Sequence, residues 1–328
     1  MKLLVLKSTD PYLNLAIEEY LFLHTEEPIL MLWQNASSVI IGKNQNAYAE
    51  IDRAYAEKHS IRIARRITGG GAVYHDLGNI NYSYISPNEV GGALDFESYS
   101  TPILRALHAL GICASLSGRN DIEVDGKKIS GNAQHRSDGR LLHHGTLLFD
   151  TDMGVLGSVL RPNRAKLQTR AIRSVGARVT NLRLLLGEDW TKDRFLDHLC
   201  RFLEAEYKAT PISAPSNDEV TALAKRNASA EWIYPEKEIL SRYTEIHAER
   251  YPFGTVEISL SMHREKILDV SITGDFFGTR PIRELEAMLC GASLASLEDV
   301  LLNCPVSEFI FGMDTTALIA LLRRETNK

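Results

Sequence analysis

The amino-acid sequence predicts an α/β protein with one large domain followed by a small one. Strand-like and helical segments alternate along the chain without forming a regular βαβ array. With 328 residues, the chain also exceeds the length at which a single hydrophobic core usually stops growing. Segments rich in glycine, arginine and histidine all lie before residue 250, so we expect a functional domain over 1–248 and an accessory α/β domain over 249–328.

Composition and charge exclude several classes of protein. Hydrophobic residues make up 44% of the chain and charged residues 24%, which is typical of a globular protein with a well-developed core. The formal net charge of -5 at pH 7 argues against a general nucleic-acid binder. The N-terminus is too poor in apolar residues for a signal peptide, and no run reaches membrane-spanning length. We therefore expect a cytoplasmic protein that binds neither membranes nor nucleic acid.

The cysteines carry no metal or disulfide signature. No two of them have CxxC spacing, and no histidine pattern accompanies them. We expect mostly buried free thiols, at Cys113, Cys200, Cys290 and Cys304.

The first segments predict a strand over 3–7 and then a helix. Asp10 can cap this helix, and Pro11 suits its first position, where an N–H group would have no partner. Glu18 and Glu19 are expected at the edge of this helix or on its exposed face, and we assign them no catalytic role. The residues at helical spacing are Leu13, Ile17, Tyr20, Leu21 and His24.

Two apolar strands follow, over 29–33 and 38–41. The second runs into a polar loop over 42–46 that suits a pocket wall. The next segments predict a helix over 51–59 and a strand over 61–68.

Three consecutive glycines, Gly69 to Gly71, end that strand. Without a Cβ they allow a ligand to approach main-chain N–H groups. The triplet alone is equally consistent with a tight turn. The preceding Arg65 and Arg66, which can bind phosphate or carboxylate, and the His75-Asp76 pair that follows favour an anion site.

A lysine-bearing hairpin is the second informative segment. After a strand over 79–85 and a helix over 101–110, Asp125-Gly126 separates two β-branched runs, which is a strong hairpin signal. Lys127 and Lys128 begin the return strand and must point to opposite faces. Two exposed edge lysines would explain them structurally. However, the small residues over 130–133 leave room for a ligand beside Lys128.

A third segment, over 141–150, predicts a buried strand with a polar patch. Adjacent His143 and His144 must face opposite ways, so they are poor ligands for one metal, and we expect one packed and one lining the site. A basic loop follows, either a solvated connection or a cover over an anionic ligand or acidic partner. Its charged residues are Arg161, Arg164, Lys166 and Arg170.

The rest of the chain predicts three helices and then a new unit. The helices cover 191–207, 217–227 and 238–247. After residue 250 we expect strands over 255–262 and 266–273, followed by the helices of the small domain, around 283–289, 297–302 and 315–324.

Together these segments resemble the bacterial two-domain lipoate–protein ligases of the biotin/lipoate ligase superfamily. The resemblance covers nearly the whole chain and depends on the combination of motifs and their order. The matching segments are RRITGGGAVYHD at 65–76, GRND at 118–121, KISG at 128–131, HHGTL at 143–147, and the early NLAIEE at 14–19 and IIG at 40–42.

The resemblance implies a large mixed-sheet catalytic domain, a small C-terminal α/β accessory domain and an ATP-dependent reaction in two steps. Lipoate and ATP give lipoyl-adenylate and pyrophosphate, and a lysine of a lipoyl-carrier domain then displaces AMP. Mg²⁺ is implied with ATP. The implied carriers are acyltransferase subunits of 2-oxoacid dehydrogenase complexes and the glycine cleavage H protein, and the enzyme is expected to be a monomer. The preferred carrier, the competition of octanoate with lipoate and movement of the small domain stay open.

The resemblance also implies residue roles. Lys128 is the expected catalytic residue, acting electrostatically on the carboxylate and the α-phosphate. Asp121 is expected near the adenylate, through Mg²⁺. The expected ATP- and adenylate-binding residues are Arg66, Gly71, Ala72, Val73, Tyr74, Asn79, Asp121 and Lys128. Those expected to bind lipoate are Gly70, His75, Lys128 and His144, with Trp33, Val39 and Leu147 as candidates for an apolar tunnel. Whether His135 or Arg136 contacts a ligand is left open.

Two alternative functions are less well supported by the sequence than the ligase function. An octanoyltransferase of the same superfamily carries its acyl group on a cysteine inside the site. In relatives with the lysine hairpin this cysteine lies between the Asn-Asp segment and the lysine, and residues 122–127 contain none. A non-catalytic protein that binds lipoyl carriers would not need Lys128 beside Asp121.

Overall fold

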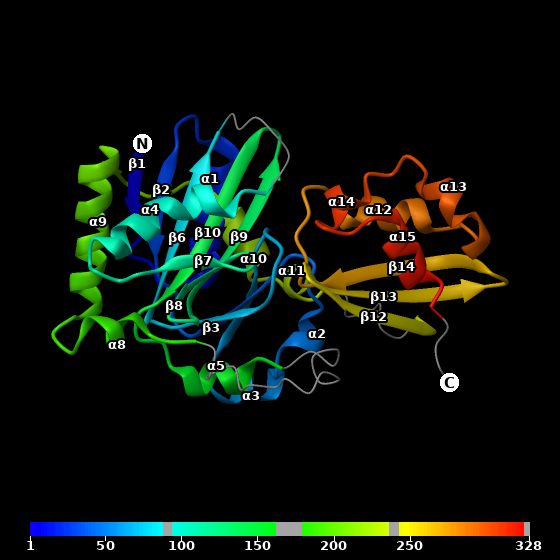
Figure 1. Ribbon diagram of the computed structural model, residues 1–328, viewed down its shortest axis with the longest axis horizontal. Coiled ribbons are helices and arrows are strands. Elements are labelled where there is room, and N and C mark those ends of the chain that lie inside the picture. The colour runs from blue at the N-terminus through cyan, green and yellow to red at the C-terminus, as the bar shows by residue number, and fades with distance from the viewer. Residues whose placement is uncertain (88–93, 162–178, 236–242, 325–328) are drawn as a thin grey trace.

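The computed structural model describes residues 1–87, 94–161, 179–235 and 243–324. Two domains lie side by side, with the larger one formed by the N-terminal part of the chain (Figure 1). The predicted mixed α/β fold with a small C-terminal domain is confirmed. No described helix is long and apolar enough to cross a membrane.

An eight-stranded mixed sheet forms the centre of the large domain, in the order β11-β1-β2-β6-β10-β9-β8-β7. Strand β1 pairs in parallel with β2 and β11, and the remaining neighbours are antiparallel. The strands are β1 (Lys2–Val5), β2 (Ile29–Trp33), β6 (Asn79–Ser86), β7 (Ser115–Ser117), β8 (Asp121–Val124), β9 (Lys127–Ser137), β10 (Arg140–Leu148) and β11 (Thr210–Ile212).

A second, three-stranded sheet carries the glycine loop, in the order β4-β3-β5. Its strands are β3 (Ser38–Ile41), β4 (Arg62–Arg65) and β5 (Val73–His75). The glycine triplet therefore connects β4 to β5, and the strand predicted over 61–68 ends earlier than expected. Short helices adjoin this sheet, namely α2 (Ala47–Glu50), α3 (Arg53–Lys58) and α5 (Met153–Val159).

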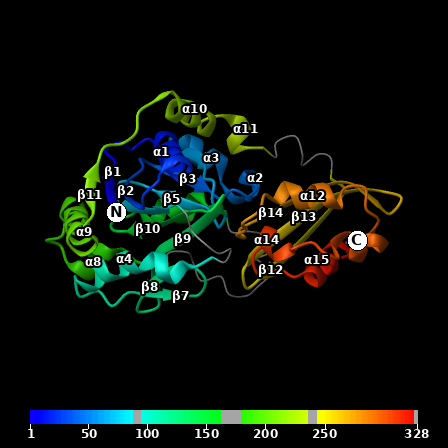
Figure 2. The same ribbon diagram turned by 90° about the horizontal axis from the view of Figure 1, so that it is seen from above.

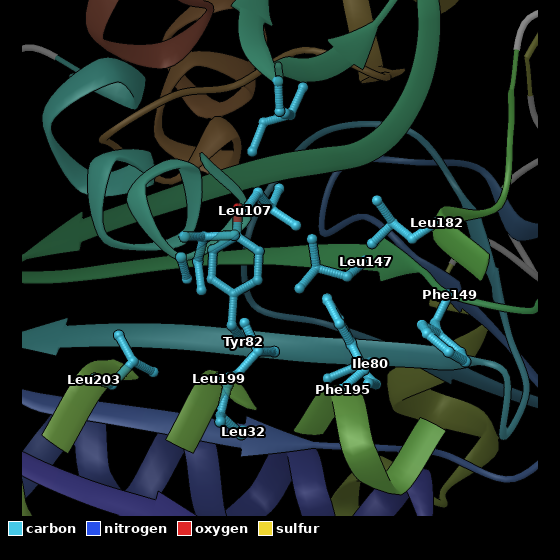
Figure 3. Close-up of a cluster of buried hydrophobic side chains, with 14 of the residues drawn as sticks. Leu32, Ile80, Tyr82, Leu107, Leu147, Phe149, Leu182, Phe195, Leu199 and Leu203 are labelled. Atoms are coloured by element: carbon cyan, nitrogen blue, oxygen red, sulfur yellow. The ribbon is translucent and has the colours of Figure 1, made fainter. Parts of the chain in front are cut away.

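Helices cover both faces of the large sheet (Figure 2). On one face lie α1 (Pro11–His24) and α10 (Asp218–Asn227), and on the other lie α4 (Phe96–His108) and α9 (Lys192–Tyr207). Figure 3 shows the core beneath α4 and α9, where Leu107, Phe195 and Leu199 pack against Tyr82 and Leu147 of the sheet. Two short helices, α8 (Leu182–Leu186) and α11 (Ala230–Ile233), complete the described domain.

Helix α1 begins as the sequence predicts but is buried more deeply. The Asp10 carboxylate accepts hydrogen bonds from the N–H groups of Tyr12 and Leu13, at 2.9 and 3.1 Å. Glu18 and Glu19 are 1% and 9% exposed, so their predicted position on an exposed face is wrong. The reason is that α10, from much later in the chain, packs on α1 and supplies Arg226, which makes a bidentate ion pair with Glu19.

The small domain packs helices on one three-stranded antiparallel sheet, β12-β13-β14. The strands are β12 (Glu245–Tyr251), β13 (Gly254–His263) and β14 (Lys266–Gly274). The helix predicted over 238–247 is wrong over the described residues 243–247, none of which is helical, because pairing with β13 extends the segment from Glu245 onwards. Residues 238–242 lie outside the described ranges. The expected boundary between residues 248 and 249 falls within β12. The helices are α12 (Ile282–Leu289), the 3₁₀ turn η1 (Leu294–Ser296), α13 (Leu297–Leu301), α14 (Val306–Phe309) and α15 (Thr315–Leu322).

The small domain rests directly on the glycine loop. The Gly70 N–H donates to the carbonyl oxygen of Phe276 at 3.3 Å, and the Gly274 N–H donates to that of Asn44 at 2.8 Å. Phe277 is 1% exposed and packs in an apolar cluster with Phe96 of the large domain. The two domains are therefore in direct contact next to the predicted site.

The cysteines are less buried than the sequence predicts. The four cysteines are free, as predicted, but Cys113 and Cys290 are exposed and the other two are half-buried, so the prediction of mostly buried thiols is wrong. In the predicted basic loop, Arg161 is described, whereas Arg164, Lys166 and Arg170 lie outside the described residues.

Candidate active site

A pocket opens where the glycine loop faces β6, β9 and β10 of the large sheet. The structure brings together eight of the residues predicted to bind ATP or lipoate along its wall, from segments far apart in sequence. They are Arg66, Gly70, Gly71, Ala72, Val73, His75, Lys128 and His144.

The floor of the pocket is one row of residues across four neighbouring strands, and Asp121 of a fifth strand continues this row. Trp33 of β2 pairs with Asn81 of β6, and Asn81 pairs with Thr146 of β10. The Gly131 N–H of β9 donates to the Thr146 hydroxyl at 3.2 Å, and Gly131 pairs with Asp121 of β8. Neighbouring strands are about 4.8 Å apart, so the row runs for about 19 Å from an aromatic end to a charged end. An elongated ligand with one charged end fits this arrangement.

Lys128 and Asp121 form the charged end. The Nζ of Lys128 lies 2.8 Å from Oδ1 of Asp121, and both side chains are about one-third exposed. A Cβ at residue 131 would lie 2.8 Å from this Nζ, so Gly131 makes room for the ammonium group. Lys127 points away and is exposed, as predicted. The Asp-Gly turn is confirmed by the positive φ angles of Asp125 (50°) and Gly126 (72°).

Arg66 braces the glycine loop from inside. Its guanidinium donates to the carbonyl oxygens of Gly69 and Gly71, at 2.7 and 2.8 Å, and to that of Ile40 at 3.0 Å. Burial lowers the pKa of Arg66 to about 10, so the guanidinium is still charged at neutral pH. Arg65 points elsewhere and donates to main-chain carbonyls, including that of Gly42 at 3.0 Å. Of the two arginines, only Arg66 lines the pocket.

A chain of hydrogen bonds connects this arginine to a buried carboxylate. The Arg66 Nε donates to the Thr68 hydroxyl at 2.9 Å, and this hydroxyl lies 2.9 Å from Nε2 of His144. The other ring nitrogen of His144, Nδ1, lies 2.9 Å from Oε1 of Glu18. Since an ionised carboxylate only accepts hydrogen bonds, Nδ1 carries the hydrogen. Glu18 thus orients His144, a contact that the sequence reading missed.

The neighbouring histidine faces the opposite side of the sheet. His143 is fully buried, with Nδ1 2.9 Å from the Gln134 amide nitrogen. The prediction that one histidine is packed and the other lines the site is therefore confirmed. Desolvation lowers the pKa of His143 to about 3.

Gly145 makes room for another cross-strand contact beside the row. It lies between Tyr82 of β6 and Asn132 of β9, and the Tyr82 hydroxyl donates to the Asn132 amide oxygen directly over it. A Cβ at residue 145 would lie 2.3 Å from that oxygen and 2.5 Å from the hydroxyl. Asn132 also bonds the Asn120 carbonyl at 2.9 Å, next to Asp121.

Several expected residues lie outside the wall of the pocket. Tyr74 is buried, with its hydroxyl 3.0 Å from that of Ser37. Asn79 is buried behind Asn81 and donates to its amide oxygen at 2.8 Å. Asp121 reaches the pocket only through Lys128. Of the tunnel candidates, Trp33 lines the pocket, whereas Val39 and Leu147 belong to hydrophobic cores.

His135 and Arg136 both pack against aromatic rings, and the question of which one contacts a ligand stays open. The His135 ring packs 5.3 Å from that of Phe22, and the Arg136 guanidinium lies 6.0 Å from the centre of the Tyr99 ring. Neither residue lines the pocket.

Four polar wall residues were missed by the sequence reading: Asn81, Asn120, Asn132 and Thr146. For Asn81 a signal exists, because asparagines alternate with Ile80 and Tyr82 in a segment that otherwise predicts a buried strand. Buried amides at this spacing mark a polar stripe on one face of the strand.

Comparison with known proteins places both parts of the chain in one family. Residues 10–204 match the lipoyl protein ligase A/B catalytic domain, and residues 241–322 match the bacterial lipoate protein ligase C-terminus. The chain is 39% identical over 292 residues to the lipoate-protein ligase LplJ of Bacillus subtilis (strain 168). This match covers 86% of our chain and 87% of the relative.

Solved structures agree with this assignment. P. falciparum LipL1, crystallised in complex with lipoate, superimposes with a TM-score of 0.78 at 26% identity, over 92% of our chain and 94% of that chain. A lipoate-protein ligase A bound with ATP superimposes with a TM-score of 0.59 at 28% identity, over 71% of our chain and 98% of that chain. Because sequence and structure agree over both domains, this chain belongs to the lipoate–protein ligase family.

Proposed function

We propose that this ligase activates lipoate with ATP and transfers the lipoyl group to a carrier lysine. In the first step a lipoate carboxylate oxygen bonds to the α-phosphorus while the bond to pyrophosphate breaks. In the second, the carrier amine attacks the acyl carbonyl, an amide forms, and AMP leaves as the amine loses its proton. The observation that carries this proposal is the row from Trp33 to the charged end that Lys128 and Asp121 form, because lipoate has an apolar end and a charged end.

Lys128 is the proposed catalytic residue. A carboxylate and a polyphosphate repel each other, so their approach needs a fixed positive charge. An ammonium beside both groups would orient the carboxylate and stabilise the charge that develops on oxygen. Lys128 would form no covalent intermediate in this role.

Asp121 is the proposed contact for Mg²⁺ at the adenylate. Within the described ranges, no group of three or more His, Cys, Asp or Glu side chains could hold a metal ion. A single accessible carboxylate nevertheless fits Mg²⁺, which commonly takes one or two carboxylates plus phosphate oxygens. When bound, the ion would neutralise phosphate charge.

The glycine loop is the proposed wall for the nucleotide. Gly71 supports this role, because a Cβ there would meet no atom within 4 Å, so a ligand can approach the backbone. Arg66 would hold the loop in shape and supply positive charge near the adenylate. The other residues proposed for nucleotide binding are Ala72 and Val73 on the pocket wall, and Tyr74 and Asn79 behind it. For lipoate we propose Gly70, His75 and His144 beside Lys128.

We further propose a cytoplasmic monomer that acts on lipoyl carriers. These are acyltransferase subunits of 2-oxoacid dehydrogenase complexes and the glycine cleavage H protein. Mass spectrometry of each carrier domain after reaction would identify the modified lysine, and light scattering would give the oligomeric state.

Thioester chemistry has little support in the described site. An octanoyltransferase needs a cysteine in contact with the acyl group. None of Cys113, Cys200, Cys290 and Cys304 lines the pocket. Moreover, burial raises the pKa of Cys200 to about 11, which disfavours its thiolate.

A swap of acyl donors tests the proposal directly. With lipoate, ATP and Mg²⁺, we expect pyrophosphate release and a lipoyl mass on the carrier. Replacing all four cysteines by serine should leave this reaction intact. Transfer from octanoyl carrier protein without ATP, abolished by a cysteine substitution, would instead establish the transferase.

A further inference from the structure

Two hydrogen-bond donors beside Trp33 have no partner among the described residues. They are Nδ2 of Asn81 and Nε2 of His75. The two side chains are 2% and 3% exposed, and both line the pocket. Buried polar atoms are nearly always paired, so such atoms in a pocket wall point to a ligand that accepts hydrogen bonds.

In the hydrogen-bond network around them, both atoms are donors. Asn79 donates to Oδ1 of Asn81 at 2.8 Å, which leaves the Asn81 NH₂ group as the unpaired end. Asn35 accepts from Asn14 through Oδ1 at 3.0 Å, so its own NH₂ group donates to Nδ1 of His75 at 3.1 Å. The ring hydrogen of neutral His75 therefore lies on Nε2. Desolvation lowers the pKa of His75 to about 3, so the ring is neutral at physiological pH.

These donors lie toward the apolar end of the pocket, away from the charged end. The Trp33 and His75 rings meet edge to face with their centres 6.2 Å apart, and Trp33 pairs with Asn81 across β2 and β6. Asn81 lies two strands from Gly131, about 10 Å. A lipoate whose carboxylate lies at Lys128 would extend along this row, with its dithiolane ring near Asn81 and His75.

We propose that Asn81 and His75 select lipoate over octanoate by donating hydrogen bonds to the dithiolane sulfurs. This inference rests on the proposed function and on the position of the carboxylate at Lys128. Divalent sulfur is a weak acceptor, but the methyl end of octanoate accepts nothing. Octanoate would therefore leave both buried donors without a partner, and a site built around donors disfavours a ligand that lacks the acceptor.

Replacing Asn81 by leucine tests this selection. Asn81→Leu should weaken lipoate binding about 3- to 10-fold and leave octanoate binding equal or tighter. Calorimetric titration with each acid measures the affinities, and lipoate- and octanoate-dependent ATP–pyrophosphate exchange measures the ratio of kcat/KM values. A second variant, Asn79→Ala, releases the Asn81 amide without altering the pocket wall and should also reduce the preference for lipoate.

Asn227→Leu is the matched control. Asn227 is 1% exposed and donates to the Tyr12 carbonyl at 3.2 Å, outside the pocket. Asn227→Leu should leave the ratio of the affinities for lipoate and octanoate unchanged, whatever it does to the stability of the protein. The inference would be overturned if Asn81→Leu lost affinity for both acids equally, or if the ratio of their kcat/KM values did not change. A wild-type protein that binds neither acid would also refute the proposed function, whereas an active enzyme with unchanged selectivity refutes the inference alone.

Discussion

Lys128 reaches Asp121 across a residue that has no side chain. The two charged groups come from facing strands of one hairpin and lie 2.8 Å apart, and their contact passes over Gly131. The ammonium is thus held at the charged end of the pocket before any ligand arrives. Such preorganisation is what electrostatic catalysis requires.

Lys128→Ala should lower the rate of adenylate formation about 10²- to 10³-fold, because the carboxylate and the α-phosphate would lose their fixed positive charge. Lys128 is not part of a hydrophobic core, so the melting temperature should change little. Lipoate-dependent ATP–pyrophosphate exchange measures the rate. Lys127→Ala, which removes the exposed neighbour, is the control and should behave like wild type. Equal rates for the two variants would remove Lys128 from the proposed mechanism.

Two glycines near the loop should respond in opposite ways to alanine. At Gly42 a Cβ would lie 2.1 Å from the Gly70 carbonyl oxygen, and backbone would have to move. Gly42→Ala should therefore destabilise the protein by about 1–3 kcal/mol and reduce activity. At Gly71 a Cβ meets nothing within 4 Å, so Gly71→Ala should keep its stability but raise the KM for ATP if nucleotide approaches there. Urea unfolding and exchange kinetics separate the two effects, and a normal KM in Gly71→Ala would contradict the nucleotide position.

The features that could be read from the sequence each carry a local signal. Asp125-Gly126 demands positive φ angles and thereby fixes the hairpin that presents Lys128. Strand alternation separates His143 from His144 without any knowledge of the fold. The glycine triplet similarly marks a place where a ligand or another backbone comes close.

What the sequence did not reveal depends on long-range packing. The spacing of Glu18 in the sequence is that of an ordinary exposed helical residue. It is buried because α10 and the sheet pack against α1. No pattern near residue 70 indicates that Phe276, about 200 residues later, will accept a hydrogen bond from Gly70. The helix predicted over 238–247 failed at Glu245 for the same reason, since a partner strand decided the conformation.

Stability should decrease in mild acid because buried histidines resist protonation. The pKa values of His75 and His143 fall from 6.5 to about 3 by desolvation. Between these values the unfolded chain binds more protons than the folded one, so stability is fully present above about pH 6.5 and decreases as the pH falls. His143→Gln should reduce the slope of unfolding free energy against pH by about 1.4 kcal/mol per unit in this window. Urea titrations between about pH 7 and about pH 5 measure the slope, and an unchanged slope would show that His143 is not titrating as described.

Phe277 should make adenylate formation depend on the small domain. Its ring lies 3.0 Å from the position of a Cβ on Gly70, packs 5.3 Å from Phe96 and lies under the Arg119 guanidinium at 4.5 Å. Phe277→Ala would leave a cavity behind the glycine loop and let both the loop and Arg119 shift. A shift of about 1 Å in groups that position a substrate can cost about 10²-fold in rate.

We therefore expect slower ATP–pyrophosphate exchange in Phe277→Ala, while the core of the small domain, which contains Phe276, stays folded. Phe311→Ala is the matched control, because Phe311 belongs to the same domain but is 37% exposed. Its exchange rate should equal that of wild type. If Phe277→Ala also exchanges at the wild-type rate, the glycine loop keeps its shape without the Phe277 ring, and the contact between Gly70 and Phe277 serves docking alone.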